Sequence, residues 1–250
     1  MTYCLGILTA SGLVMAADSR TNAGVDYIST YQKLFDFSVD SDRVLLLCVS
    51  GNLSVTQSAL TMMQRDIDSK EEISLHTLPS LYEIARYIGQ KVRHVQDENR
   101  PWLEKDGIDY QCTILLGGQI KGSQPELFMI YSQGNFIQAS KETPFLQIGE
   151  AKYGKPILDR VLNFHTTLEA AAKCALLSID STMKSNISVG PPIRLVMYEA
   201  NSFKVKYKLC LDTDAPYLMK IRKLWENCLN EAFERMPNVE WQPENHQSSR

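Results

Sequence analysis

The sequence predicts an α+β fold in which two β-sheets pack against each other and helices cover their outer faces. Three observations lead to this prediction. Blocks of strand-like segments alternate with pairs of helix-like segments along the chain. The 250 residues are 44% hydrophobic, which is enough to bury a sizeable core. No linker or change in composition divides them, so we expect one domain over residues 1–235, including a C-terminal helix, and a polar tail over 236–250.

The first block of strands begins at the N-terminus. Residues 3–8 and 13–17 are apolar runs separated by Thr-Ala-Ser-Gly, which is a hairpin signal. Segment 25–42 carries alternating apolar residues and ends in turn formers. RVLLLCVSG at 43–51 is a continuous apolar run closed by glycine, which is typical of a buried strand.

Helical periodicity replaces the strand pattern after residue 51. Apolar side chains recur on one face of a helix beginning near Asn52, a favourable N-cap residue, and on one face of a second helix over 78–96. A second block of strands follows, over 110–118, 125–132, 135–139 and 145–149.

The second helical stretch covers 150–184, with a break near 163–165. A last pair of strands is expected over 191–200 and 203–212, followed by a helix over 215–235.

Trp225 and Trp241 lie in the last helix and the tail. Aromatic residues near a chain end fit internal packing, but they are also enriched at subunit interfaces, and we favour the interface.

The charge and cysteine content exclude several classes of protein. A formal net charge of -3 gives no electrostatic case for binding nucleic acid or an anionic membrane. The six cysteines form no CxxC pair and lie mostly in apolar runs, which indicates reduced thiols of a cytoplasmic protein. We expect no secretory signal, because no basic leader precedes an apolar stretch, and no apolar run is long enough to span a bilayer.

Common catalytic motifs are absent from the sequence. It has no P-loop, dinucleotide-binding, zinc-protease or GxSxG motif, and its four histidines are not spaced as metal ligands. We therefore predict no metal and no organic cofactor.

The hydroxyl of Thr2, directly after Met1, is a candidate nucleophile. A threonine hydroxyl reacts only when a base removes its proton. Once Met1 is removed, Thr2 supplies such a base itself, because an α-amine titrates at about pH 7.7–8.0, close to neutrality. Nucleophile and base then lie on one residue, and no histidine is required.

Such a site needs a cation beside the hydroxyl, a carboxylate that holds the cation, and a backbone N–H for the oxyanion. Lys33 in YQKLF, Asp18 in AADSR and Gly51 in CVSGN are candidates, because each ends or interrupts a strand-like run. Taken singly, each residue also has an ordinary interpretation, as a solvated lysine, a turn residue and a strand-to-helix junction.

These features together resemble a proteasome β-type subunit: a strand-initial Thr, an A-x-D-S-R hairpin end, a lysine fifteen residues later and a strand ending S-G-N. More closely, nearly the whole chain is similar to the bacterial ancestral β-subunit family (Anbu) of proteasome-related proteins. The matching stretches are TYCLGILTASGLVMAADSRTNAGVDYIS, IGEAKYGKPILDR and DSTMKSNISVGPPI.

The resemblance implies the four-layer αββα sandwich of N-terminal nucleophile hydrolases. It implies that Thr2 is the nucleophile, with Asp18 and Lys33 as its supporting pair. The Gly51 N–H would receive the oxyanion, and the subunits would form a homo-oligomer, either a ring or an open helical assembly.

The resemblance adds Ser188 to the candidate catalytic residues, with Ser185 and Glu150 as secondary candidates. Proteasome β subunits carry a Ser in a G-S-G turn, where alignment of IGEA places Glu150. They also carry an Asp three residues before a Ser, where SNISVG places Ser185 and Ser188. Ser188 is therefore kept, whereas the other two positions differ. The serines are also compatible with ordinary loop hydroxyls, and Glu150 with the first turn of a helix.

The predicted function is a threonine-type peptidase that cleaves peptides or unfolded protein through an acyl-enzyme ester. Two alternatives remain open: a weakly active or inactive assembly or scaffold protein, suggested by Glu150 and Ser185, and an amidase of the same fold. The sequence does not decide whether an ATPase partner feeds the assembly.

Overall fold

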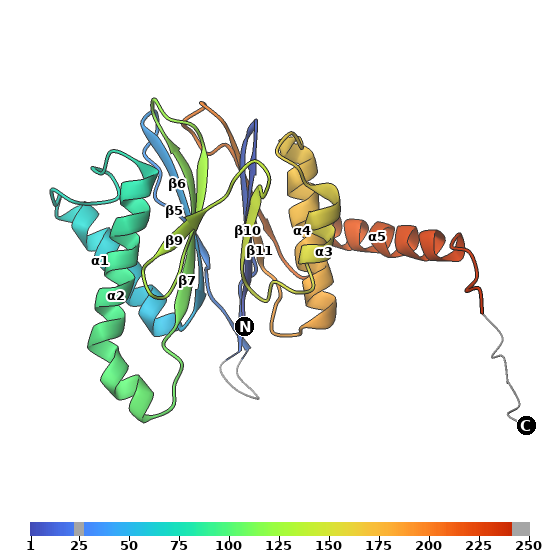
Figure 1. Ribbon diagram of the computed structural model, residues 1–250, viewed down its shortest axis with the longest axis horizontal. Helices are drawn as coiled ribbons and strands as arrows, with labels where there is room; N and C mark the ends of the chain where they lie inside the picture. Colours follow the sequence, from blue (N-terminus) through green and yellow to red (C-terminus); the bar gives the residue numbers. More distant parts are fainter. Residues whose placement is uncertain (23–27, 242–250) are drawn as a thin grey trace, which may run out of the picture.

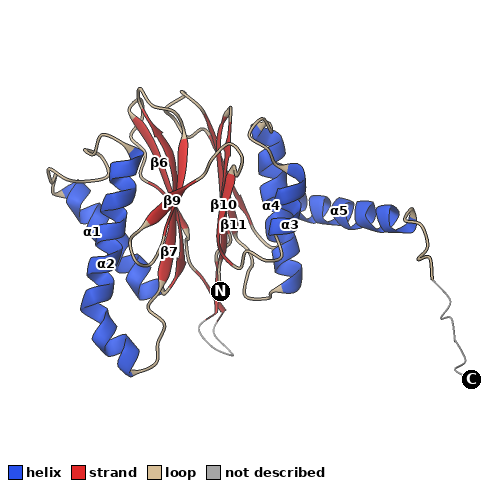
Figure 2. Cartoon of the chain, in the orientation of Figure 1, coloured by secondary structure: helices blue, strands red, loops and turns tan. Residues whose placement is uncertain are grey.

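Four layers stack side by side in the computed structural model of the chain, which describes residues 1–22 and 28–241 (Figure 1). Helices α1 (Leu53–Asp68) and α2 (Leu81–Lys105) cover one sheet, and α3 (Lys155–Val161) and α4 (Leu168–Ser185) cover the other. Figure 2 shows the strands of both sheets enclosed between these two helical layers. The predicted α+β sandwich is confirmed.

Both large sheets are antiparallel throughout. The first has the order β10-β1-β2-β11-β12, with β1 Tyr3–Thr9, β2 Gly12–Ala17, β10 Phe145–Gly149, β11 Ile193–Glu199 and β12 Tyr207–Leu211. The second has the order β5-β6-β7-β8-β9, with β5 Leu34–Asp36, β6 Arg43–Gly51, β7 Cys112–Ile120, β8 Glu126–Ile130 and β9 Phe136–Gln138. A small separate ribbon pairs β3 (Arg20–Asn22) with β4 (Ile28–Thr30).

The N-terminal hairpin forms as predicted. Thr9 pairs with Gly12, so a two-residue turn joins β1 to β2. Every residue of both strands is buried, because one face of this sheet meets helices and the other meets the second sheet. That double burial explains why the two runs are continuously apolar instead of alternating. It also fixes the start of β1, and therefore Thr2, at one end of a rigid layer.

The two sheets approach closely at Gly6 of β1. A β-carbon added there would lie 2.7 Å from Leu127 Cδ1 and 2.8 Å from Met15 Sδ. These two side chains, one from each sheet, are fully buried and fill the space that the glycine leaves. Such tight packing is typical of protein interiors.

The helices differ from the prediction mainly at their ends. Asn52 caps α1 by accepting a hydrogen bond from the Val55 N–H, as its position suggested. Helix α2 continues nine residues beyond the predicted end at residue 96, through Pro101 to Lys105. This last part is mostly exposed, so it carries no apolar periodicity that could reveal it. Helix α3 begins only at Lys155, after a turn.

Helix α5 (Pro216–Glu234) leaves the layered body as an arm (Figure 1). Of its residues only Leu218 is fully buried. Residues 236–241 of the predicted polar tail are exposed and contain neither helix nor strand. Residues 242–250, like residues 25–27 of the predicted segment 25–42, lie outside the described residues.

None of the helices in the described ranges combines the length and the apolar character that crossing a bilayer requires.

We predict that Leu127→Ala lowers the free energy of unfolding by about 2–5 kcal/mol, because it opens a cavity between the sheets where Gly6 supplies no side chain to fill it. Urea denaturation followed by tryptophan fluorescence measures the change. Ile137→Ala on β9 of the same sheet is the control, since this side chain is 42% exposed. Equal losses for the two variants would contradict the proposed role of Leu127.

Candidate active site

Thr2 lies at the start of β1, against the end of β10. Tyr3 pairs with Gly149 across these strands, and the Glu150 backbone N–H donates a hydrogen bond of 2.7 Å to the Thr2 carbonyl oxygen. Gly149 has a φ of 81°, and a side chain at this position would collide with the same carbonyl oxygen. Glycine therefore allows β10 to hold Thr2 this closely.

A buried ion pair lies beside the start of β1. Lys33 Nζ is 2.8 Å from Asp18 Oδ1, and both side chains are almost completely shielded from solvent. The same Oδ1 accepts a hydrogen bond of 3.0 Å from the Tyr3 N–H. Asp18 Oδ2 accepts another, of 3.1 Å, from the Gly190 N–H. Both carboxylate oxygens are thus satisfied, as a buried charge requires.

The Lys33 ammonium group also contacts two backbone carbonyl oxygens. It donates to the Arg20 carbonyl oxygen at 2.6 Å and to the Met1 carbonyl oxygen at 3.4 Å. With the bond to Asp18, these contacts use all three donors of the ammonium group. The cation therefore lies next to the peptide bond that joins Met1 to Thr2.

Burial and neighbouring charges both act on the pKa values of the titrating groups of this site. Burial raises the pKa of the Asp18 carboxyl group, and Lys33 and the two N–H donors oppose this rise. The pKa of the N-terminal amine, here that of Met1, is lowered by burial and by Lys33, whereas Asp18 and Glu150 act to raise it. An amine at this end of the chain is thus held in its neutral, basic form more readily than an exposed one.

A cavity of about 510 Å³ opens over these residues. It is lined by Met1, Thr2, Thr21, Tyr31, Gln32, Lys33, Val49, Ser50, Gly51, Leu53, Thr56, Gly149 and Glu150. Thr2, Lys33, Gly51 and Glu150, which were selected from the sequence, therefore share one cavity, and Asp18 joins them through Lys33.

Gly51 closes β6 at the edge of this cavity. Its φ is 106°, and a β-carbon would collide with the carbonyl oxygen of Gln111, which directly precedes the neighbouring strand β7. A glycine is required here for the strand to turn into α1 while its backbone borders the cavity.

Ser188 is connected to the site through Asn186. The Ser188 backbone N–H donates to Asn186 Oδ1 at 3.0 Å, and Asn186 Nδ2 donates to Glu150 Oε2 at 3.1 Å. The contact thus uses the Ser188 backbone, and the asparagine side chain bridges it to Glu150.

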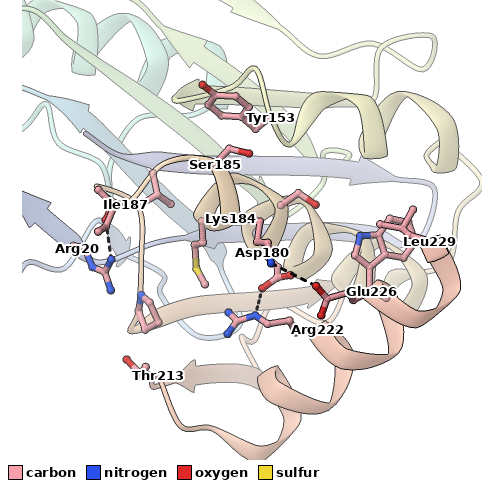
Figure 3. Close-up of a pocket in the computed structure, with 15 residues that line it drawn as sticks. Arg20, Tyr153, Asp180, Lys184, Ser185, Ile187, Thr213, Arg222, Glu226 and Leu229 are labelled. Carbon is pink, nitrogen blue, oxygen red and sulfur yellow. Dashed lines mark hydrogen bonds and ion pairs between the residues drawn. The ribbon is translucent and has the colours of Figure 1, made fainter. Parts of the chain in front are cut away.

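Ser185 lies elsewhere. It lines a groove of about 600 Å³ between α4 and α5, together with Ile187 and Leu229 (Figure 3). It does not line the cavity of Thr2. Alignment of SNISVG with the proteasome pattern thus indicated the loop that lies near the cavity. The residue of that loop that contacts Glu150 is Asn186.

Sequence reasoning missed Asn186 because an asparagine after a helical run indicates an ordinary helix end, and this residue is indeed the C-cap of α4. It also missed Thr21, Tyr31 and Gln32, which line the cavity. Their only signal was their position beside Arg20 and Lys33 in the chain.

In the part of the chain that the structure describes, no group of three or more His, Cys, Asp and Glu side chains is placed to hold a metal ion. The residues around the cavity supply a hydroxyl, a buried cation, the carboxylate of Glu150 and backbone N–H groups.

Comparisons with known proteins show which family the chain resembles. The family model described as proteasome subunit matches residues 2–197. A solved structure of Anbu (ancestral beta-subunit) from Yersinia bercovieri is 45% identical, with 97% of this chain and 100% of that chain covered and a TM-score of 0.91. A structure described as the helical assembly of the Anbu complex from Pseudomonas aeruginosa is 44% identical, covers 96% and 98% of the two chains and has a TM-score of 0.90.

A comparison with curated proteins found no match. The residues matched by the family model include Thr2, Asp18 and Gly51, and the structure from Yersinia bercovieri covers 97% of the chain. The chain therefore belongs to the proteasome family and, within it, to the ancestral β-subunit (Anbu) group.

Proposed function

We propose that the protein is a threonine peptidase in which Thr2, freed by removal of Met1, hydrolyses peptide bonds of peptides or unfolded protein. One observation supports this proposal above the others. A buried lysine, held by a buried carboxylate, points its ammonium group at the peptide bond on the N-terminal side of Thr2.

The reaction proceeds in two halves. The α-amine of Thr2 removes the proton of its own Oγ as this oxygen attacks the substrate carbonyl carbon, and the negative charge moves to the carbonyl oxygen. The Gly51 N–H stabilises this oxyanion. The intermediate then collapses, the peptide C–N bond breaks, and the ammonium group returns its proton to the leaving amine. An ester joins Thr2 Oγ to the acyl fragment.

Water completes the cycle. The free amine of Thr2 accepts a proton from the water as it attacks the ester carbonyl. The carboxylic acid leaves, and the proton returns to Thr2 Oγ. Lys33 assists both halves, because a cation beside Oγ favours the deprotonated oxygen. Asp18 keeps this lysine in place through the buried ion pair.

Self-assembly is the second part of the proposal. Leu229, Phe233 and Met236, on and just after the α5 arm, are 50%, 80% and 64% exposed and recur at helical spacing. Exposed apolar stripes of this kind mark interaction surfaces, and a relative 44% identical to this chain is described as a helical assembly. We therefore propose a homo-oligomer, a ring or an open helix, in which α5 contacts a neighbouring subunit.

We also propose a cytoplasmic location, because all six cysteines are free thiols and four of them are buried.

A scaffold protein with little or no hydrolysis is the second candidate, favoured by the carboxylate of Glu150 in the cavity and by the distance of Ser185 from it. An amidase acting on small amides would use the same residues. Activity against peptide and small-amide panels separates these candidates.

We predict that Thr2→Ala lowers peptidase turnover at least about 1,000-fold, because it removes the nucleophile while leaving the fold intact. The measurement combines a fluorogenic peptide panel with the intact mass of the protein after exposure to a peptide epoxyketone. The parent protein should have lost Met1 and gained one adduct, and Thr2→Ala should gain none. Unchanged turnover in the variant would refute the mechanism.

We predict that Lys33→Met lowers the free energy of unfolding by about 3–5 kcal/mol, because it leaves the Asp18 charge buried without its cation. The double variant Asp18→Asn/Lys33→Met should be less destabilised, since it leaves no buried charge. Urea denaturation of Lys33→Met, Asp18→Asn and the double variant gives the comparison. A double variant that loses as much stability as the sum of its single changes would show that the pair is not coupled.

We predict that Phe233→Glu shifts the assembly toward smaller species, because it places a charge on the apolar stripe of α5. Analytical ultracentrifugation of the full chain measures the distribution. Asn227→Glu, which adds the same charge on another side of α5, is the control. Loss of assembly in both variants, or in neither, would argue against the stripe as a contact.

A further inference from the structure

The carboxylate of Glu150 occupies a defined place in the cavity of Thr2. Its backbone N–H binds the Thr2 carbonyl oxygen, so the two residues are held together whatever the side chain does. Its Oε2 accepts the hydrogen bond from Asn186 Nδ2. Oε1 has no hydrogen-bond partner within the described residues and is available to another donor.

Asn186 is itself fixed from two sides. Its backbone N–H donates to the Thr182 carbonyl oxygen at 2.8 Å, at the end of α4. Its Oδ1 accepts the Ser188 N–H. An amide held at its backbone and at its side-chain oxygen has one orientation left for Nδ2, and this orientation is directed at Glu150. The carboxylate is therefore pre-positioned by the loop that follows α4.

The same pair borders Met1. Asn186 Nδ2 lies 3.6 Å from Met1 Sδ, and Met1 and Glu150 line the cavity together. Removal of Met1 leaves a new α-ammonium group on Thr2 and opens space beside this pair. An ammonium group carries three donors, and it needs acceptors in a site partly shielded from water.

We propose that Glu150, positioned by Asn186, accepts a hydrogen bond from the α-ammonium group of Thr2 and thereby orients this amine toward Oγ. The inference depends on the proposed function, because it concerns the base of that reaction. Glu150 is then a positioning residue. Where proteasome β subunits carry the neutral hydroxyl of a serine, this chain carries a charged acceptor.

The charged groups around the amine set the direction of the effect. For the amine of Met1, Lys33, which precedes β5, lowers the pKa, whereas Asp18, directly after β2, and Glu150 act to raise it; the same groups would surround the amine of Thr2. The oxygens of Asp18 are already used by Lys33, Tyr3 and Gly190. The nearby Arg20 guanidinium group is bound to the Ile187 carbonyl oxygen. Unlike Asp18, the Glu150 carboxylate therefore has an oxygen, Oε1, that is available to the amine.

A carboxylate next to the amine stabilises the protonated form and raises the pKa of the base. Since only the neutral amine can remove the Oγ proton, the rate rises with pH as the ammonium group loses its proton. Replacing the charge of Glu150 should therefore move this rise to lower pH, and should also lower the maximum rate because the amine is less well oriented.

The experiment measures the rate of peptide epoxyketone adduct formation by intact mass between pH 5.5 and 9, with fluorogenic peptide turnover in parallel. Glu150→Gln should shift the midpoint of the pH profile down by about 0.5–1 unit and lower the plateau. Glu150→Asp, which keeps the charge, should restore the midpoint to near the parent value. Asn186→Ala, which frees the carboxylate, should lower the plateau with a smaller shift.

Glu142→Gln is the matched control, because Glu142 is an exposed carboxylate in the loop before β10, and its profile should equal that of the parent. An unmoved midpoint in Glu150→Gln, or an equal shift in Glu150→Gln and Glu150→Asp, would overturn the role of Glu150. Thr2→Ala distinguishes a failure of this inference from a failure of the proposed function. If Thr2→Ala still forms the adduct, Thr2 is not the nucleophile.

Discussion

The site depends on one buried interaction, the ion pair between Lys33 and Asp18. Two charges removed from water cost several kcal/mol each unless every lone pair and every donor finds a partner. The partners come from four places in the chain: the Tyr3 N–H in β1, the Gly190 N–H in the loop before β11, and the carbonyl oxygens of Arg20 and Met1. The pair therefore forms only when the start of β1, the end of β2 and the loop after α4 are all in place.

This requirement couples the chemistry to the layers of the fold. Thr2 directly precedes β1 and accepts a hydrogen bond from the Glu150 N–H just after β10, which fixes it at one end of the first sheet, and Gly51 reaches the same cavity from the second sheet. The sheets are held at a fixed spacing by tight contacts such as that of Gly6 with Leu127. A shift of one sheet relative to the other would therefore separate the proposed oxyanion donor from the nucleophile, which explains why a site of a few polar groups is supported by such a continuous apolar core.

Much of the fold could be predicted from the sequence, because strands buried on both faces and amphipathic helices leave regular apolar patterns. These apolar patterns are missing from exposed segments, because exposed side chains need not be apolar. The exposed end of α2, through Pro101, gave no signal, and neither did the turn between Glu150 and Lys155. The site was harder to predict, because Thr2, Asp18, Lys33 and Gly51 each have an ordinary interpretation singly, and only their resemblance to a family pattern joined them. Asn186 was hidden for a geometric reason: a shift of one residue at the end of a helix decides which side chain reaches Glu150 and which lines the groove beside α5.

The structure with Met1 present shows what removal of this residue changes. Lys33 donates one hydrogen bond to the Met1 carbonyl oxygen, and the Asn186 side chain contacts the sulfur of Met1. Both groups also serve the interactions that hold the site together, with Asp18 and Glu150 respectively. Loss of Met1 therefore disturbs no structural hydrogen bond within either pair. In the mechanism proposed above, loss of Met1 frees one donor of the Lys33 ammonium group and creates an amine on Thr2 near Glu150, whose Oε1 has no partner within the described residues. The ion pair of Lys33 with Asp18 and the contact of Asn186 with Glu150 already exist before Met1 is removed, so the proposed mechanism requires one peptide-bond cleavage and no rearrangement of these two pairs.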